Sequence, residues 1–265
     1  MWLRLMLAIS LVFWVGAEAP AEADALEDIR ARGQLRLGVK TDYPPFGYKK
    51  DGKHVGLDVD LARDLARRMG VAAALHPVVA VDRLTLLEEG RIEVVVATLT
   101  DTDARRRRVR MIEPHYYASG TNAITTKRRR IRTWAALSRK PVCGVRGAFY
   151  NQTLVDRLGI RLLAFVETET ALQALRGGRC AAFVFDDTFL QGVLMTPTWR
   201  NYEMPFETTD MAPWAVAVAG GRPALAAFVR EAVEDWHRSG LIQELEKRHG
   251  LKPSQFAAEM HQKYR

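Results

Sequence analysis

Residues 93–105 read Glu-Val-Val-Val-Ala-Thr-Leu-Thr-Asp-Thr-Asp-Ala-Arg. Glu93 is followed by an apolar run, residues 94–97, which is typical of a strand buried on both faces of a parallel sheet. Two threonine hydroxyls follow the run, and Thr102 or Asp103 can then cap a helix through Arg108. The stretch therefore predicts a buried strand, a polar loop at its carboxyl end, and a helix that contains Arg105.

The same order of strand, loop and helix recurs on both sides of this stretch. Apolar residues alternate in the expected strands and return at helical spacing in the expected helices. The expected strands are residues 34–40, 72–79, 93–97, 121–126, 142–146, 162–166, 181–185, 201–205 and 215–219, and the expected helices are residues 61–69, 83–89, 103–108, 150–158, 170–176, 223–239 and 241–249. This alternation predicts an α/β protein with two lobes and mostly parallel sheets.

Length and composition agree with a globular protein. The chain has 265 residues, of which 48% are hydrophobic and 26% are charged. These values exclude collagen, low-complexity disorder and a polytopic membrane protein. The formal net charge of +8 favours anionic partners, which could be nucleic acid or a small anionic ligand.

The first residues have the three parts of a secretory signal peptide. Residues 1–4 carry one positive charge, residues 5–17 are apolar, and Ala21-Glu22-Ala23 offers small residues for cleavage. The apolar run is shorter than the roughly 20 residues that cross a bilayer. We therefore predict cleavage after Ala23 and a periplasmic protein, which argues against a role with nucleic acid in the cytoplasm.

Cys143 and Cys180 are the only cysteines. Each lies at the edge of an expected strand, and two cysteines in an exported chain permit one disulfide. The sequence leaves open whether they are joined or are two buried thiols, because it does not give the separation of their Cα atoms. The chain has no Cys-x-x-Cys and no paired histidine spacing, so we expect no metal site and no cofactor.

Open α/β sheets bind ligands at the carboxyl ends of their strands and at helix N-termini. The residues that follow the expected strands are Lys40, Tyr43, Phe46, Ala80, Arg83, Thr98, Thr100, Arg105, Arg146, Asp186 and Asp187. They supply four cations, two hydroxyls, two aromatic rings and a pair of carboxylates. Arginine offers a planar fork for a carboxylate, and aspartate accepts hydrogen bonds from an ammonium group. The set suits a zwitterion with an additional negative charge.

Five stretches in this order resemble the extracytoplasmic solute-binding proteins of amino-acid ABC transporters. They are residues 38–46, 56–62, 97–105, 115–120 and 177–187, and the resemblance extends from about residue 34 to about residue 250. In that family an arginine after two threonines binds the α-carboxylate of the ligand, and an aspartate that ends a strand of lobe 2 binds the ammonium. The resemblance assigns these roles to Arg105, with Thr98 and Thr100, and to Asp186, with Asp187 as the alternative.

Within the family the chain is most similar to glutamate- and aspartate-binding proteins. Arg83 lies where those proteins have an arginine, and Lys40 takes the place of an arginine that helps to hold the side-chain carboxylate. Three positions depart from them: Ala80 replaces a serine, residues 146–150 lack the threonine or serine that usually follows the glycine, and a histidine of lobe 2 is replaced near Thr168. The resemblance implies an acidic amino acid as ligand and leaves another anionic or amphipathic one open.

The resemblance also implies the architecture and the partners. The expected fold is the two-lobe, type II periplasmic-binding-protein fold with a two-strand hinge near residues 118–122 and 208–213. Lobe 1 is expected to comprise residues 24–120 and 212–265, and lobe 2 residues 121–211. We expect a monomer that closes on its ligand and then docks on a membrane permease, with no catalytic residue.

Two other functions remain open at this point. The same scaffold hosts a cyclohexadienyl dehydratase, for which Glu167 or Glu169 could supply the general acid. The second alternative is an accessory subunit that has lost its ligand.

Three further expectations concern single segments. The basic runs 105–110 and 127–132 are expected to be solvated apart from Arg105; Phe149 and Tyr150 are candidate cleft walls; and Asp58 is expected to cap a helix.

Overall fold

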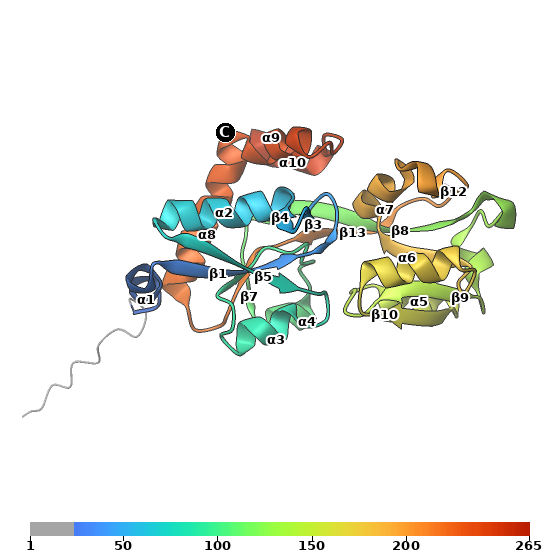
Figure 1. The fold of residues 1–265 in the computed structure, drawn as a ribbon, viewed down its shortest axis with the longest axis horizontal. Coiled ribbons are helices and arrows are strands. Elements are labelled where there is room, and N and C mark those ends of the chain that lie inside the picture. The colour runs from blue at the N-terminus through green and yellow to red at the C-terminus, as the bar shows by residue number, and fades with distance from the viewer. Residues whose placement is uncertain (1–23) are drawn as a thin grey trace, which may run out of the picture.

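The computed structural model describes residues 24–265, so the predicted signal peptide and its cleavage site lie outside the described residues. Two α/β bodies lie side by side and are joined by long strands (Figure 1). We call the body that contains α1 lobe 1 and the other lobe 2. Within the described part of the chain, no helix is long and apolar enough to cross a membrane.

Lobe 1 is built on a five-stranded sheet in the order β5-β1-β6-β14-β7. The strands are β1 (Gln34–Lys40), β5 (Ala72–Val78), β6 (Val94–Val95), β7 (Arg110–Met111) and β14 (Ala217–Val218). β1 pairs in parallel with β5 and β6, and β14 is antiparallel to β6. A hairpin sheet of β2 (Asp42–Tyr43), β3 (Gly47–Lys50) and β4 (Lys53–Val55) lies beyond the end of β1.

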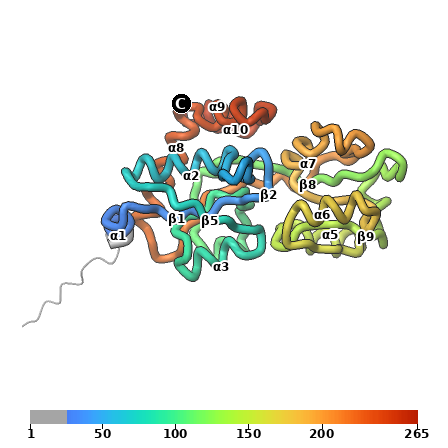
Figure 2. The backbone as a smooth tube through the Cα atoms, in the orientation of Figure 1, coloured from blue at the N-terminus to red at the C-terminus, as the bar shows by residue number. Residues whose placement is uncertain are grey.

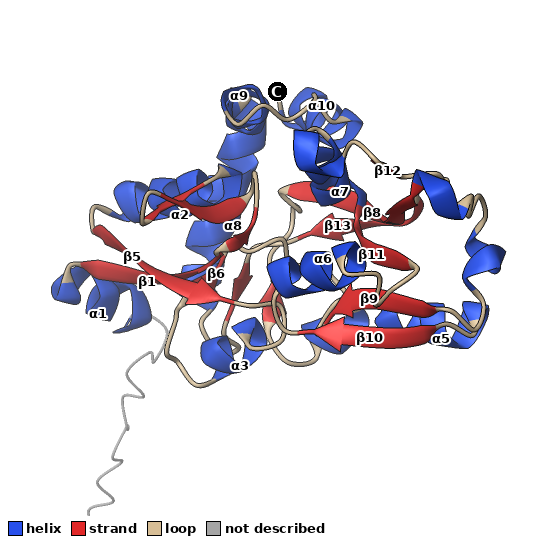
Figure 3. Cartoon of the chain, turned by 45° about the vertical axis from the view of Figure 1, so that its right-hand side comes forward, coloured by secondary structure: helices blue, strands red, loops and turns tan. Residues whose placement is uncertain are grey.

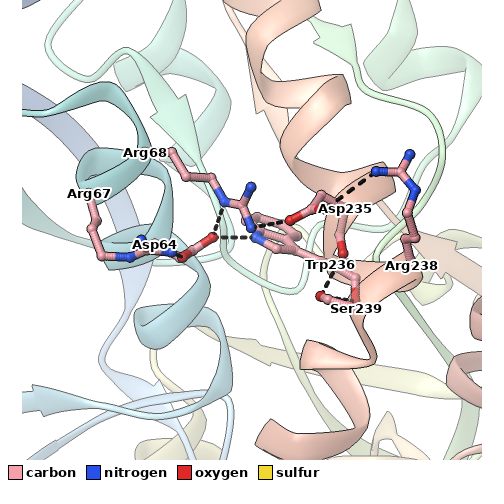
Figure 4. Close-up of polar contacts among 7 residues, drawn as sticks. All are labelled: Asp64, Arg67, Arg68, Asp235, Trp236, Arg238 and Ser239. Atoms are coloured by element: carbon pink, nitrogen blue, oxygen red, sulfur yellow. Dashed lines mark hydrogen bonds and ion pairs between the residues drawn. The ribbon is translucent and has the colours of Figure 1, made fainter.

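The helices of lobe 1 pack around its sheet or, at the C-terminal end of the chain, on other helices. They are α1 (Asp24–Arg32), α2 (Leu57–Met69), α3 (Arg83–Glu88), α4 (Asp103–Arg106), α8 (Pro223–Ser239), α9 (Leu241–Arg248) and α10 (Gln255–Tyr264). α2 buries its apolar stripe, as its helical periodicity predicts. Its Asp64 binds Arg68 and accepts a 2.7 Å hydrogen bond from the indole of Trp236, while Arg68 bonds Asp235 at 2.6 Å (Figure 4). These contacts hold α8, which follows lobe 2 in the chain, in lobe 1.

Lobe 2 has a sheet in the order β10-β9-β11-β8-β12, and β13 pairs with β8. The strands are β8 (Tyr117–Thr126), β9 (Pro141–Val145), β10 (Arg161–Phe165), β11 (Ala182–Asp186), β12 (Tyr202–Glu203) and β13 (Thr209–Trp214), and the helices are α5 (Asn151–Leu158), α6 (Thr168–Arg176) and α7 (Asp187–Leu194). β9, β10 and β11 are parallel. Cys143 and Cys180 form a disulfide with a Cα separation of 5.6 Å, because β9 and β11 are neighbours.

β8 and β13 form the connection between the lobes, as the backbone trace shows (Figure 2). They are antiparallel, and residues 117–121 pair with residues 209–214. The predicted hinge segments, 118–122 and 208–213, fall in these strands. The exact lobe boundaries, after residues 120 and 211, stay a prediction.

The α/β fold with mostly parallel sheets is confirmed, and several elements differ from the expectation. Three of the expected strands, 93–97, 201–205 and 215–219, are shorter than predicted. Only residues 94–95, 202–203 and 217–218 are in strands, because each pairs with its neighbouring strand over two residues. The sequence reading missed α1, α7, α10, β13 and the hairpin sheet (Figure 3). These elements are short or lack a clear apolar period, and tertiary contacts determine them.

Candidate functional site

A small cavity lies between the lobes at the carboxyl ends of their strands. Its lining residues are Lys40, Tyr43, Ala80, Arg83, Thr98, Thr100 and Arg105 from lobe 1, and Ala148, Phe149, Tyr150, Phe185 and Asp186 from lobe 2. The space open to the centre of a water molecule is about 20 Å³, which is room for about one water. An amino acid is larger, so it can enter the cavity only when the lobes separate.

The structure brings together seven of the nine residues expected at the ligand. Phe46 and Arg146 are the two that do not line the cavity. Phe46 is fully buried against Trp214 and Tyr117, with ring centroids 5.0 and 5.1 Å away, and so belongs to the core beside the hinge. The side chain of Arg146 is exposed. The turn after β9 reaches the cavity with Ala148 to Tyr150 instead.

The structure also distinguishes the two neighbouring aspartates. Asp186 ends β11 and lines the cavity. Asp187 points to the hinge, where it accepts hydrogen bonds from the Ser119 hydroxyl at 2.7 Å and from the Gly120 N–H at 3.1 Å. Consecutive residues at a strand end point to opposite faces, so only one of the pair can face the cavity.

Arg105 spans the two lobes. Thr102 caps α4 by accepting a hydrogen bond from the Arg105 N–H. The guanidinium donates 2.5 Å to the Thr100 carbonyl of lobe 1 and 2.9 Å to the Gly147 carbonyl of lobe 2. The side chain is 9% exposed and borders the cavity. A planar cation held in this way can present its remaining N–H groups to a carboxylate.

Arg83 is the second buried guanidinium. One terminal nitrogen donates to the carbonyls of Ala97 and Thr98, the latter at 3.2 Å. Its Nε is buried and has no partner among the described residues. Burial lowers the pKa of Arg83, and the carboxylates of Asp186 and Asp58 oppose that shift. An anion in the cavity would compensate this buried charge.

Lys40 is also buried, but it is already paired. Its Nζ lies 2.9 Å from Oδ1 of Asp42, and burial lowers its pKa. Oδ2 of Asp42 accepts two hydrogen bonds from Thr168 of lobe 2, one from the N–H at 3.0 Å and one from the hydroxyl at 2.8 Å. Glu167, the N-cap of α6, provides no side-chain cap. Asp42 therefore caps a helix of the opposite lobe, and the pair connects the lobes.

Asp186 makes the third direct contact between the lobes. Its Oδ2 accepts a 2.7 Å hydrogen bond from the hydroxyl of Tyr43. Burial raises the pKa of Asp186 to about 6, while Tyr43, Arg83 and Lys40 act in the opposite direction. The Tyr150 hydroxyl beside it is buried and has no hydrogen-bond partner among residues 24–265. The Asp186 carboxylate and the Tyr150 hydroxyl can therefore both hydrogen-bond a ligand in the cavity.

Asp58 does not cap α2, contrary to the prediction from sequence. Gly56 is the N-cap of that helix and no side chain caps it. The fully buried carboxylate accepts hydrogen bonds from the Thr98 N–H at 2.9 Å and the Tyr116 hydroxyl at 3.0 Å. Burial raises its pKa to about 7. Asp58 holds Thr98 in the left-handed conformation, at φ 45°, which aims the Thr98 carbonyl at Arg83.

Several residues at the site were missed in the sequence. Asp42 directly precedes Tyr43 and follows the strand that ends at Lys40, so its position alone indicated that it could lie at the site. Phe185 and Ala148 carry no comparable polar signal. Glu167 and Glu169, the acids considered for an enzyme, are exposed and do not line the cavity.

One group of possible metal ligands occurs in the described part of the chain: Asp101, Glu113 and His115. The guanidinium of Arg106 bonds both carboxylates of this group. A cation of the protein thus already neutralises it, and the group gives no support for a metal site.

The chain is similar to known proteins over most of its length. Residues 35–252 match the model of the bacterial extracellular solute-binding proteins, family 3. The L-cystine-binding protein TcyJ of Escherichia coli (strain K12) is 28% identical over 92% of both chains. The ABC transporter glutamine-binding protein GlnH of Bacillus subtilis (strain 168) is 26% identical over 88% of this chain and 86% of the relative.

Solved structures show the same fold. An ancestral arginine-binding protein bound to arginine superposes with a TM-score of 0.77 at 27% identity, covering 82% of this chain and 98% of that one. The solute receptor for L-cysteine of Neisseria gonorrhoeae gives a TM-score of 0.80 at 23% identity over 84% and 92% of the two chains. These relatives are binding proteins and not enzymes. The family match over most of the chain, together with the two-lobe fold and the interlobe cavity, shows that this chain belongs to the bacterial extracellular solute-binding proteins, family 3.

Proposed function

We propose that the protein binds an amino acid with an acidic side chain between its lobes and delivers it to an ABC transporter permease. The charge of the interlobe cavity is the observation that carries this proposal. Relatives named for cystine, glutamine and arginine support an amino acid as the ligand class. They do not favour an acidic one, so the choice of side chain rests on the residues of this chain.

The charges at the cavity leave one cation without a counterpart. Lys40, Arg83 and Arg105 line it with Asp186, which gives 3 − 1 = +2. The carboxylate of Asp42 is paired with Lys40, which reduces the sum to +1. Asp58 does not line the cavity, and because its pKa is raised to about 7 it offsets only part of this charge near neutral pH. A neutral zwitterion would leave this charge uncompensated, and a cationic ligand would add to it. Glutamate or aspartate, with a net charge of −1, would balance it.

The proposed ligand contacts follow from this balance. Arg105 binds the α-carboxylate, Asp186 accepts hydrogen bonds from the ammonium, and Arg83 binds the side-chain carboxylate. Thr98, Thr100 and Tyr43 complete the walls. Lys40 acts through Asp42 on the approach of the lobes rather than as a free ligand cation. The ligand favours the closed state because it contacts both lobes there.

Arg83→Met tests the acidic specificity. Methionine keeps much of the volume and removes the charge. We expect the affinity for glutamate or aspartate to fall by at least roughly tenfold, because a charged hydrogen bond contributes about 1.5–3 kcal/mol. Isothermal titration of the wild type and the variant measures the change.

Glutamine is the matched control ligand, because it has the shape of glutamate without the charge. Its affinity should change by less than about threefold in the same variant, within the usual scatter of single contacts. An equal loss for both ligands would contradict the role of Arg83. If no amino acid stabilises the wild type against thermal unfolding, the accessory subunit without a ligand becomes the better description.

Binding should weaken in acid because of Asp186. Its pKa is raised to about 6, so the carboxyl holds a proton at pH values where an ordinary aspartate is ionised. The ligand ammonium needs the ionised form. We expect the affinity to be constant above about pH 7 and to fall by about tenfold per pH unit below about pH 6. Isothermal titrations from below pH 6 to above pH 7 measure this dependence, and Asp186→Asn should bind weakly with no such slope.

A further inference from the structure

The end of lobe 2 farthest from the cavity carries a concentration of cations. The cavity lies at the carboxyl ends of β9 and β11, and the opposite end of the same sheet holds the starts of β9, β10, β11 and β12 and the end of β8. The exposed cations there are Lys127, Arg128, Arg129, Arg130, Arg139, Lys140, Arg161, Arg176, Arg179 and Arg200. We call these ten residues the basic pole.

Backbone contacts place the segments of the basic pole side by side. The Arg161 N–H donates to the Lys140 carbonyl at 2.9 Å, and the Ala181 N–H donates to the Pro141 carbonyl at 2.7 Å. Lys127 in turn donates from Nζ to the Arg200 carbonyl at 2.8 Å. Neighbouring strands are about 4.8 Å apart, so the pole extends roughly 20 Å across the sheet. Figure 1 shows this end of lobe 2 at the right, away from lobe 1.

The basic pole lacks the acidic partners that other arginines of the chain have. In lobe 1, Arg68, Arg106 and Arg108 each pair with a carboxylate. None of the ten residues of the pole pairs with a carboxylate of residues 24–265. The segments 126–141, 158–161, 176–182 and 196–202 contain no Asp or Glu. The nearby Glu203 is already paired with Arg132.

Two residues of the pole stand in backbone positions that favour glycine. Arg130 and Arg139 have φ values of 51° and 59°, in the left-handed region. A side chain there costs about 1 kcal/mol relative to glycine. Arginine at these two positions thus lowers the stability of the fold relative to glycine. This is expected if the positive charge has a function.

We propose that the basic pole docks the protein on the surface of a membrane that contains anionic phospholipids. Ten unpaired cations over a width of roughly 20 Å match a broad layer of phosphate groups better than one small anion. Because the pole and the cavity lie at opposite ends of the same strands, docking there leaves the cavity uncovered. This inference concerns a surface separate from the ligand cavity and does not depend on which amino acid binds.

Co-sedimentation with vesicles tests the proposal. The purified protein should bind vesicles of phosphatidylcholine mixed with phosphatidylglycerol and not vesicles of phosphatidylcholine alone. Binding should be lost near 1 M salt, where the Debye length falls to about 3 Å. Arg128→Glu/Arg129→Glu/Arg130→Glu should lower the partition coefficient by at least about tenfold, since each basic residue near an anionic surface raises it by roughly fivefold.

Lys49→Glu/Lys50→Glu/Lys53→Glu is the matched control. These exposed lysines of the lobe 1 hairpin have no ion-pair partner in the described chain, and the variant changes the net charge equally. An equal loss in both variants would show a non-specific effect of net charge and overturn the proposal. Binding to soluble polyglutamate but not to the vesicles would assign the pole to an acidic protein and overturn it as well. Unchanged thermal unfolding and amino-acid titration in both variants separate the result from misfolding and from failure of the proposed function.

Discussion

Arg105→Ala should lower the affinity for every amino acid by roughly a thousandfold. The guanidinium is buried between the lobes, contacts both of them and borders the cavity. Removing it leaves the α-carboxylate of any ligand without its cation in a buried site, and breaking a buried charge pair costs about 3–5 kcal/mol. Isothermal titration with glutamate, aspartate and glutamine measures the loss, which should be similar for all three.

Arg107→Ala is the control for this variant. Arg107 lies two residues away and is exposed. The Arg107→Ala variant should bind ligands as the wild type does. Normal binding by Arg105→Ala would refute the assignment of the α-carboxylate, whereas a loss limited to acidic ligands would exchange the roles of Arg105 and Arg83.

Gly147→Ala is expected to have the second largest effect, because it should prevent closure of the lobes. A Cβ at this position would lie 2.6 Å from the backbone carbonyl oxygen of Ala80 in the opposite lobe. Overpacking of this kind costs about 1–3 kcal/mol, and the Gly147 carbonyl would also move away from Arg105. We expect a loss of affinity of roughly a hundredfold for every ligand. Small-angle X-ray scattering with saturating ligand should show lobes that stay apart.

Gly178→Ala separates the interlobe clash from backbone strain. Gly178 also has a left-handed conformation, with φ +75° against +80° for Gly147, but a Cβ there would meet no atom within 4 Å. This variant should lose a little stability and keep its affinity. Equal losses of affinity in both variants would mean that the strain in lobe 2, and not the contact with Ala80, is responsible.

Local patterns in the sequence predicted most of the elements that bear the site. The apolar runs around residues 93–97 and 181–185 and the helical periodicity of residues 61–69 indicated buried strands and a covering helix, because burial on one or two faces imposes these periods. Since parallel strands place their carboxyl ends at one edge, seven of the nine expected residues meet at one cavity. Phe46 and Arg146 were expected there too, but position in a loop does not give the direction of a side chain.

Periodicity and composition were enough to predict the α/β class, the two lobes, and the cations and carboxylate at the strand ends. The tertiary structure alone decided the contacts between residues far apart in the chain: that Asp42 caps a helix of the other lobe, that Asp58 holds Thr98, and that Asp186 rather than Asp187 faces the cavity. It also gathered the cations of separate turns into the basic pole. The reason is physical, since periodicity reports the burial of one element, whereas hydrogen bonds across the cleft depend on how two folded lobes meet.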